Sequence, residues 1–439
     1  MDFRTAFLNA PVDQLLYIEL DAETRRALSL LAEDDHIPLH QRKSIKLLLT
    51  NLSSKDKGLR LLRALYGIKQ APRQWHTMIH NFLTDKLGFS ANQKDTCIYS
   101  MQRNGVQILL LLYVDDILVA SRNSDAVQWT GTQLANKFKI KKLGFPKLFL
   151  GVDIKKEDGR ITMSLDTYLT PLLDRFNLTP NPHVGTPLSP GYYCDDTGEA
   201  KADEVLYRHK LGVLLWAAIV CKPEALYAAT YLGRFNSRPT VSSVKELDRA
   251  VLYLYNSRNK GITLGGRLLR PIAYCDSDFA SDQMDRKSVS GFCIYLGDGP
   301  VSWQSKKQDL VALSSCESEF VAMSLCCQTL MWLVQLLENN LSFKFKYSST
   351  IWCDNASAIA LLKPGVANRR TKHIDIRFHF ARDCQEKGLI KVLHIPGNQN
   401  CADLLTKPVK KCIFQDLLPR LLGERATNSP DESQLTLRS

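Results

Sequence analysis

Apolar positions follow two different periods in the first third of the chain. After Pro72 they recur at helical spacing, which predicts a helix that begins near this proline. The residues of this pattern are Trp75, Ile79, Phe82, Leu83 and Leu87. Two strongly apolar runs, 106–113 and 117–120, flank Asp115 and Asp116. They predict a β-hairpin that carries both acids in its turn.

The next segment combines a short strand, 161–163, with a helix that we expect Asp166 to cap. The helix would bury one apolar face, made of Leu169, Leu172, Leu173 and Phe176. A stretch rich in proline and glycine, 179–191, follows and is typical of a linker.

Helical spacing returns over 205–258, and from Ile272 onward short runs of strand character take its place. These strands are expected near 272–274, 291–295, 301–303 and 350–353, with a long helix from Glu317 to Glu338 between the last two. The pattern predicts a multidomain protein of α+β and α/β type. Its predicted parts are 1–180, a linker and helical segment at 181–265, a mixed α/β domain at 266–408, and a frayed polar tail at 409–439.

Composition narrows the class of protein. The 439 residues carry a net charge of +12 at pH 7, which favours a polyanionic partner such as nucleic acid. No uninterrupted apolar run approaches the roughly 18 residues of a membrane span, and the N-terminus lacks the pattern of a signal peptide. The 12 cysteines show no C-x-x-C pair. We expect reduced thiols in a cytosolic or nuclear protein without a membrane partner.

Asp115 and Asp116 are the sharpest chemical feature. Two carboxylates between apolar strands are costly unless their charge is compensated, and a hard cation such as Mg²⁺ prefers carboxylate oxygens. A solvated hairpin turn, in which aspartate is common, explains the bare dipeptide equally well.

A second set of acids lies in the last third of the chain. Strand periodicity puts Asp276 and Asp278 on one face, and Asp354 ends a later strand. Glu317 and Glu319 lie near the start of the long helix, where residues two apart point about 200° apart, so only one can face a shared site. Asp403 follows further on. Each acid alone is typical of an ordinary turn or surface position.

Three segments resemble, in the same order, the reverse transcriptases of copia-type retrotransposons: 2–10, 65–75 and the Tyr113-Val114-Asp115-Asp116 box. The resemblance implies a right-hand polymerase palm in which Asp2, Asp115 and Asp116 are catalytic and hold two Mg²⁺ ions, with Mn²⁺ as a substitute. It also implies that Phe7, Gln70 and Tyr113 contact the substrate. For Phe7, a plain core aromatic is an equally good reading.

A dense series of segments resembles the RNase H domain that follows these reverse transcriptases: 286–292, 302–308, 312–319, 370–377 and 402–408. The resemblance implies that Asp276, Glu319, Asp354 and Asp403 are catalytic and bind two Mg²⁺ ions. Glu317 and Asp278 are the alternatives to Glu319 and Asp276.

Several basic residues near these segments have two readings. His373 and His394 are candidate general acids or phosphate contacts, against a bland surface or core role. Five other basic residues could contact the backbone of an RNA–DNA hybrid or could simply form a solvated surface: Lys306, Lys307, Arg369, Arg370 and Lys372.

The expected function is RNA-directed DNA synthesis and cleavage of RNA in RNA–DNA hybrids. Expected partners are an RNA template, a DNA primer, the hybrid and deoxynucleoside triphosphates, with protease and integrase parts upstream and a location in cytoplasmic virus-like particles or the nucleus. Copia-type enzymes carry a fingers segment before the residue matched by Asp2, and one residue precedes it here. We therefore expect little polymerase activity from this palm by itself. The alternatives are an inactive retroelement relic and a co-opted nucleic-acid-binding protein.

Overall fold

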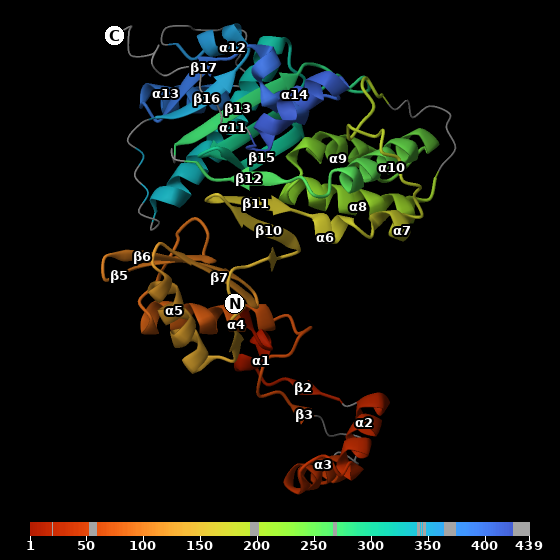
Figure 1. Cartoon of the computed structure of the whole chain (residues 1–439), viewed down its shortest axis with the longest axis vertical. Helices are drawn as coiled ribbons and strands as arrows, with labels where there is room; N and C mark the ends of the chain where they lie inside the picture. The colour runs from red at the N-terminus through yellow and green to blue at the C-terminus, as the bar shows by residue number, and fades with distance from the viewer. Residues whose placement is uncertain are drawn as a thin grey trace. The chain divides into compact units, whose positions relative to one another are not determined.

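The computed structural model describes residues 1–19, 21–51, 59–193, 202–266, 270–339, 343, 345, 348–363 and 375–424, with the backbone alone for 375–379. Two compact units divide the chain (Figure 1), the first comprising Met1–Gly144 and the second beginning at Phe145. Each unit combines sheets with helices, and this confirms the predicted fold class.

The first unit is built on a six-stranded sheet in the order β4-β5-β6-β7-β1-β8, beside a small β2-β3 pair. Its elements are β1 (Asp2–Phe3), α1 (Ala6–Asn9), β2 (Tyr17–Ile18), α2 (Ala22–Glu33), α3 (Leu39–Asn51), β3 (Leu59–Arg60), α4 (Ala71–Asn81), η1 (Phe82–Lys86), β4 (Ser90–Ala91), β5 (Ile98–Arg103), β6 (Val106–Tyr113), β7 (Asp116–Ser121), α5 (Ser124–Lys137) and β8 (Ile140–Lys141).

The predicted hairpin and helix of this unit are confirmed. Strands β6 and β7 pair with Tyr113 opposite Asp116, which leaves Val114 and Asp115 as the turn. Alternation along β6 buries one face, as the apolar pattern requires. Helix α4 has Pro72 in its first turn and buries Trp75 and Ile79 against the sheet.

The second unit contains a four-stranded sheet, β12-β11-β10-β9, and a five-stranded sheet, β15-β14-β13-β16-β17. Its elements are β9 (Leu148–Phe149), β10 (Val152–Glu157), β11 (Arg160–Ser164), α6 (Asp166–Leu169), α7 (Leu172–Phe176), α8 (Glu204–Val220), η2 (Pro223–Ala225), α9 (Leu226–Leu232), η3 (Gly233–Phe235), α10 (Val241–Asn256), β12 (Ile262–Leu264), β13 (Pro271–Asp278), β14 (Val289–Leu296), β15 (Gly299–Lys307), α11 (Ser315–Glu338), β16 (Ser349–Cys353), α12 (Ala356–Ala360), α13 (Asp375–Glu386), β17 (Ile390–His394), η5 (Gly397–Gln399), η6 (Cys401–Leu405) and α14 (Lys411–Leu421).

The five-stranded sheet is mixed. Strands β13, β14 and β15 are antiparallel neighbours, whereas β16 joins β13, and β17 joins β16, in parallel. Helix α11 packs against β13 and β14. Among the described helices, α11 alone is long and apolar enough to cross a membrane by length and composition, but 61% of its apolar window is buried inside the protein. Such burial is typical of a core helix.

Two predictions about local structure are wrong. The helix expected after Asp166 is two short helices, because Pro171 lacks the N–H that would continue the helical ladder. Asp166 begins the first of these helices, and Leu165 takes the capping position. Nor does the polar tail begin at residue 409. Helix α14 buries Phe414, Leu417 and Leu421, while the rest of the predicted tail, from 425, lies outside the described residues.

A large hydrophobic core lies in the second unit. It joins apolar residues of α7, α8, α9 and α10 to β13, β14, η6 and α14. The predicted linker contributes Val184 and Leu188 to this core, and Ser189 binds Glu246 of α10. The predicted domain boundaries at 180 and 265 stay predictions.

Candidate metal centres

Four carboxylates from different elements converge at one edge of the five-stranded sheet. Asp276 lies in β13, Glu319 in the second turn of α11, Asp354 directly after β16, and Asp403 in η6. Strands β13 and β16 run parallel with Tyr274 opposite Trp352, so residues two positions further along, Asp276 and Asp354, emerge side by side.

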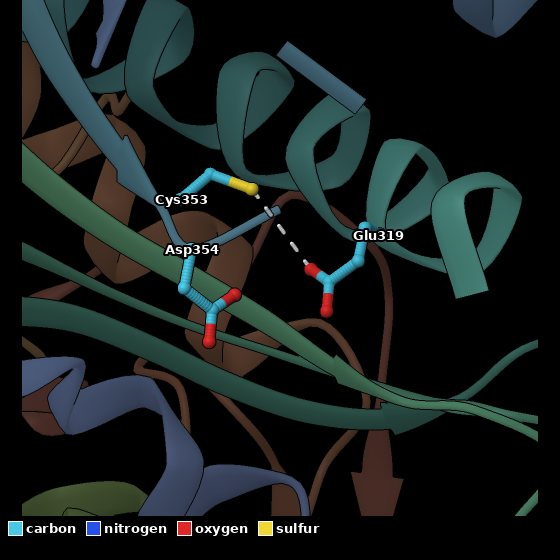
Figure 2. Close-up of side chains that lie close together, drawn as sticks. All are labelled: Glu319, Cys353 and Asp354. Carbon is cyan, nitrogen blue, oxygen red and sulfur yellow. Dashed lines mark hydrogen bonds between the residues drawn. The ribbon is translucent and has the colours of Figure 1, made fainter. Parts of the chain in front are cut away.

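Two sets of possible ligand atoms lie close together there. Oxygens of Asp276, Asp354 and Asp403 are all within 4.8 Å of one another. The same holds for Glu319, Cys353 and Asp354, whose side chains point toward a common space (Figure 2). The Cys353 thiol lies 4.0 Å from Glu319 Oε2.

The cluster is crowded with negative charge in a buried place. Asp276 is 2% exposed and Glu319 is 6% exposed. Burial and the Asp276 carboxylate raise the pKa of Glu319 to about 10, and the same two causes raise the pKa of Asp403 to about 7. They also raise the pKa of Asp354. A cation would relieve this strain, because it stabilises the ionised form of each group.

A lysine and a threonine that follow Asp403 contact the same acids. The Lys407 ammonium lies 3.0 Å from Asp403 Oδ1 and 3.7 Å from Asp276 Oδ2. The Thr406 hydroxyl donates a hydrogen bond to Asp276 Oδ2. Burial lowers the pKa of Lys407, but Asp276 and Asp403 outweigh it and hold the pKa above its ordinary value.

Gly291 of β14 lets η6 approach the sheet this closely. A Cβ at this position would lie 2.7 Å from Thr406 Cγ2 and 2.9 Å from Leu405 Cβ. Both distances are shorter than a carbon–carbon contact allows. The glycine therefore permits the packing that brings Asp403 beside Asp276.

The alternative acids and the basic candidates lie as follows. Glu317 turns away from the cluster and accepts a hydrogen bond from the Leu313 backbone N–H (2.9 Å). Asp278 ends β13 outside both ligand sets, and burial raises its pKa. His394 Nε2 lies 3.1 Å from the backbone oxygen of Asp354.

Lys306 and Lys307 form ion pairs with Asp309 and Asp282. Four further basic candidates lie outside the described residues: Arg369, Arg370, Lys372 and His373.

The three acids predicted for the polymerase meet at the β6–β7 hairpin of the first unit. Asp2 of β1 is paired with Asp116 of β7, and the Phe3 N–H donates to the Asp115 carbonyl (2.8 Å). Burial and the Asp2 carboxylate raise the pKa of Asp116. The carboxylates do not form a tight group, because within the described part of the chain only the two sets in the second unit bring three ligand atoms within 4.8 Å.

Aromatic residues hold the hairpin turn in shape. Val114 adopts a left-handed backbone with φ of 50°, which is costly for a β-branched residue. Trp75 Nε1 donates to the Val114 carbonyl (2.8 Å), and the Tyr66 hydroxyl donates to Asp115 Oδ2 (3.1 Å). The other oxygen, Asp115 Oδ1, is buried and has no hydrogen-bond partner among the residues that the structure describes. The turn is thus anchored with one carboxylate oxygen left available.

The three predicted substrate contacts have different surroundings. Phe7 packs on Tyr66, with ring centroids 4.6 Å apart. Tyr113 is 57% exposed at the end of β6. Gln70 lies before α4, and its side chain donates to Gln14 (3.1 Å). Their roles stay predictions.

Comparison with known proteins identifies the family. The sequence profile described as "Reverse transcriptase (RNA-dependent DNA polymerase)" matches residues 49–190. The retrovirus-related Pol polyprotein from transposon RE1 of Arabidopsis thaliana is 34% identical over 364 residues, which are 82% of this chain and 25% of that protein. The Pol polyprotein from transposon TNT 1-94 of Nicotiana tabacum is 30% identical over 435 residues, 96% of this chain and 30% of that protein. The chain belongs to the Pol proteins of copia-type retrotransposons.

This Pol chain thus spans about a quarter to a third of the length of these relatives. Among solved structures it matches the foamy viral protease-reverse transcriptase in complex with RNA/DNA hybrid, with a TM-score of 0.47 and 13% identity over 90% of this chain and 43% of that chain. An RNase H1 isolated from compost matches 33% of this chain and 99% of its own, with a TM-score of 0.25 and 16% identity.

The residues of the Pol chain fit divalent ions in the second unit. Carboxylate oxygens from different elements can surround a hard cation there, and the raised pKa values mark a shortage of positive charge. Thr406, Lys407 and Cys353 were not assigned roles by sequence reasoning, nor was Tyr66 in the first unit. Thr406 and Lys407 follow Asp403 by one helical turn, and this spacing was the available signal.

Proposed function

We propose that the second unit hydrolyses the RNA strand of RNA–DNA hybrids. The observation that supports this proposal is the convergence of Asp276, Glu319, Asp354 and Asp403 at one sheet edge. Their ligand atoms lie within 4.8 Å of one another in two sets that share Asp354, one of which includes the Cys353 sulfur. Such crowding of buried carboxylates is costly to a fold and is typical of metal-dependent active sites. The RNase H resemblance of this part of the sequence supports the same reaction.

Each residue has a proposed task. Asp276, held by Thr406, and Asp354 supply oxygens from adjacent strands, while Asp403 and Glu319 close the site from two sides. We propose Mg²⁺ as the natural ion, because every acidic ligand offers hard oxygen, with Mn²⁺ as a substitute. When bound, a pair of such ions activates the attacking water and stabilises the leaving oxygen.

Cleavage of a labelled RNA–DNA hybrid by the 439-residue chain tests this proposal. Asp354→Asn should lower the rate by at least about a hundredfold, because it removes a charged ligand from the site. Asp383→Asn is the matched control, since Asp383 is an exposed acid paired with Lys387 on α13. Unchanged cleavage by the folded Asp354→Asn variant would refute the site. Binding of the hybrid without cleavage by the wild type would favour a co-opted binding protein.

We also propose RNA-directed DNA synthesis for the first unit, with a primer, an RNA template and deoxynucleoside triphosphates as partners. The supporting observation is the pairing of Asp2 with Asp116 beside an anchored Asp115. Asp115→Asn should abolish primer extension but leave hybrid binding intact, whereas Asp125→Asn on α5 should change neither. Extension should be measured for these 439 residues and for a longer Pol chain that contains them. Full extension by Asp115→Asn in the longer chain would exclude the assignment.

A further inference from the structure

The Lys407 ammonium occupies a position among the acids of the second unit. Its distances are 3.0 Å to Asp403 Oδ1 and 3.7 Å to Asp276 Oδ2. Among the described residues, Lys407 is the one lysine or arginine that forms an ion pair with any of the four acids of the cluster. The lysine follows Asp403 by four residues, so the backbone of η6 and the next turn delivers both members of the pair.

The acids need such a counter-ion when no other cation is bound. The side chain of Asp276 is 3% exposed and that of Asp403 is 15% exposed, so water screens their charges poorly. An unpaired buried charge is strongly destabilising, whereas a paired one is tolerated. Lys407 therefore stabilises the metal-free fold.

The same position conflicts with a divalent ion. An ion bound by Asp276 and Asp403 would share both carboxylates with the ammonium, and two cations held by the same carboxylates would repel each other. The side chain of Lys407 is 35% exposed, and its four-carbon stem is flexible, so the ammonium can turn toward solvent.

We propose that Lys407 is a built-in counter-ion that a divalent metal must displace, and that this positioning residue sets the metal affinity of the site. The inference rests on the proposed RNase H site. It explains how a cluster of four acids, two of them buried and two half-buried, folds before metal arrives. It also means that the affinity for the metal is lower than the acids alone would provide.

Isothermal titration calorimetry of the full chain with Mn²⁺, in the absence of nucleic acid, tests the proposal. Asp354→Asn defines the binding that occurs elsewhere on the chain. Lys407→Gln should bind Mn²⁺ at the second-unit site at least about tenfold more tightly, because removing a unit charge near 4 Å from a divalent ion matters even in a water-like medium. Lys407→Arg keeps the charge and should bind no more tightly than the wild type.

Thermal unfolding of the second unit in EDTA supplies a readout independent of affinity. Lys407→Gln should lower the unfolding midpoint in EDTA and gain more from added Mn²⁺ than the wild type does. Lys387→Gln is the matched control, because Lys387 also pairs with an acid four residues earlier but at an exposed site. It should change neither measurement.

Unchanged or weaker Mn²⁺ binding by Lys407→Gln would overturn the proposal, as would tighter binding by Lys407→Arg. If Lys407→Gln folds only with Mn²⁺ present, the counter-ion role is supported. If Lys407→Gln does not fold under any condition, the Mn²⁺ affinity of Lys407→Arg decides the outcome. Neither measurement involves hybrid cleavage. A chain that fails to cleave hybrid can therefore still support the Lys407 proposal, and the two failures are distinguishable.

Discussion

Asp276 is held by residues that are distant from it in the sequence. The Thr406 hydroxyl and the Lys407 ammonium both approach its Oδ2 atom, and both belong to the segment that follows Asp403. A hydrogen bond such as that from Thr406 fixes the orientation of a metal ligand and raises its effectiveness, whereas the Lys407 ammonium competes with a metal ion for the same carboxylate. At the scale of single residues, the site is therefore more than its four carboxylates.

Thr406→Val tests the contribution of the hydroxyl. Valine preserves the buried shape but removes the hydrogen bond to Asp276, so hybrid cleavage and Mn²⁺ affinity should each fall by about 10- to 100-fold. Thr329→Val, which removes only a hydrogen bond within α11, serves as the control. Equal cleavage by Thr406→Val and the wild type would mean that the hydroxyl does not orient Asp276.

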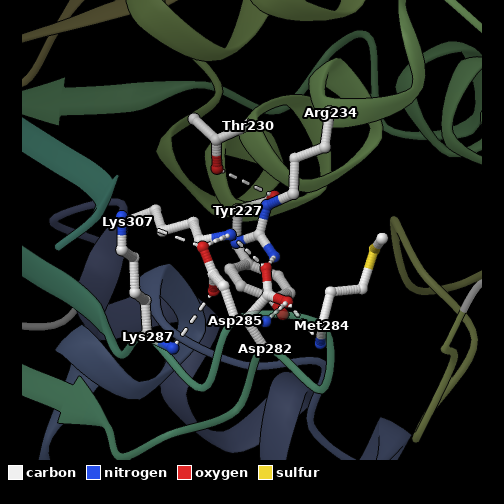
Figure 3. A network of polar contacts seen from close by, with 8 residues as sticks. All are labelled: Tyr227, Thr230, Arg234, Asp282, Met284, Asp285, Lys287 and Lys307. Carbon is white, nitrogen blue, oxygen red and sulfur yellow. Dashed lines mark hydrogen bonds and ion pairs between the residues drawn. The ribbon is translucent and has the colours of Figure 1, made fainter. Parts of the chain in front are cut away.

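At the scale of elements, an ionic network joins the loop between β13 and β14 to its neighbours (Figure 3). Asp282, 7% exposed, accepts contacts from Arg234 of η3 (2.7 Å) and Lys307 of β15 (2.5 Å). Lys307 also pairs with Asp285 (2.9 Å). The network ties the helical segment to the sheet that carries Asp276. Lys307, a candidate for contacts with the hybrid, thus forms its ion pairs with Asp282 and Asp285 of the protein itself.

Asp282→Ala should destabilise the second unit by about 3 kcal/mol, because Arg234 and Lys307 lose the partner that compensates their charge. Urea-induced unfolding at pH 7 measures the difference. Asp383→Ala, which breaks an exposed pair, should change the free energy of unfolding much less. A loss for Asp282→Ala no larger than that of the control would contradict a stabilising network.

The contribution of Asp282 should depend on pH in a defined direction. Burial alone raises the pKa of Asp282, but bonds from Lys307 and the Met284 N–H, with the Arg234 charge, hold it below the ordinary value of 3.8. A lowered folded-state pKa gives stability that is complete above the unfolded value and is lost as the pH falls through the folded one. The difference in the free energy of unfolding between the wild type and Asp282→Ala should stay constant from pH 7 to about pH 5 and become smaller below about pH 4. A difference that grows as the pH falls would contradict the lowered pKa of Asp282.

At the scale of the molecule, the continuous core decides which piece can fold alone. Trp303 Nε1 of β15 donates to the Ala218 carbonyl of α8 (2.8 Å), and the Tyr295 hydroxyl of β14 donates to the Arg420 carbonyl of α14 (3.2 Å). The sheet thus depends on helices before and after it. The predicted RNase H segment, 266–408, contains neither α8 nor α14.

We expect residues 145–439 to fold and cleave hybrid, and residues 266–408 to unfold at a lower temperature or aggregate. The shorter piece exposes the apolar residues that α8 and α14 cover, and exposed patches of this kind favour association. Circular dichroism melts and gel filtration of the two pieces check the expectation. Equal unfolding midpoints would show that the helices are dispensable.

Local pattern by itself predicted only part of the elements. Helical spacing after Pro72 predicted α4, apolar alternation predicted the β6–β7 hairpin, and the apolar run after Glu317 predicted α11. These patterns suffice because burial of one face is a local property of a helix or strand. The motifs also identified the candidate acids, because a motif depends only on residue type and order in the sequence.

Tertiary structure decided which acids meet and what compensates their charge. Only the packing of α11 on the sheet turns Glu319 toward Asp354 while Glu317 binds Leu313, and only the approach of η6 over Gly291 brings Lys407 to Asp276. Lys407 and Asp276, for example, lie more than a hundred residues apart in the sequence. No local periodicity can therefore predict such contacts. Their geometry, and the charge balance that follows from it, exists only once the chain has folded.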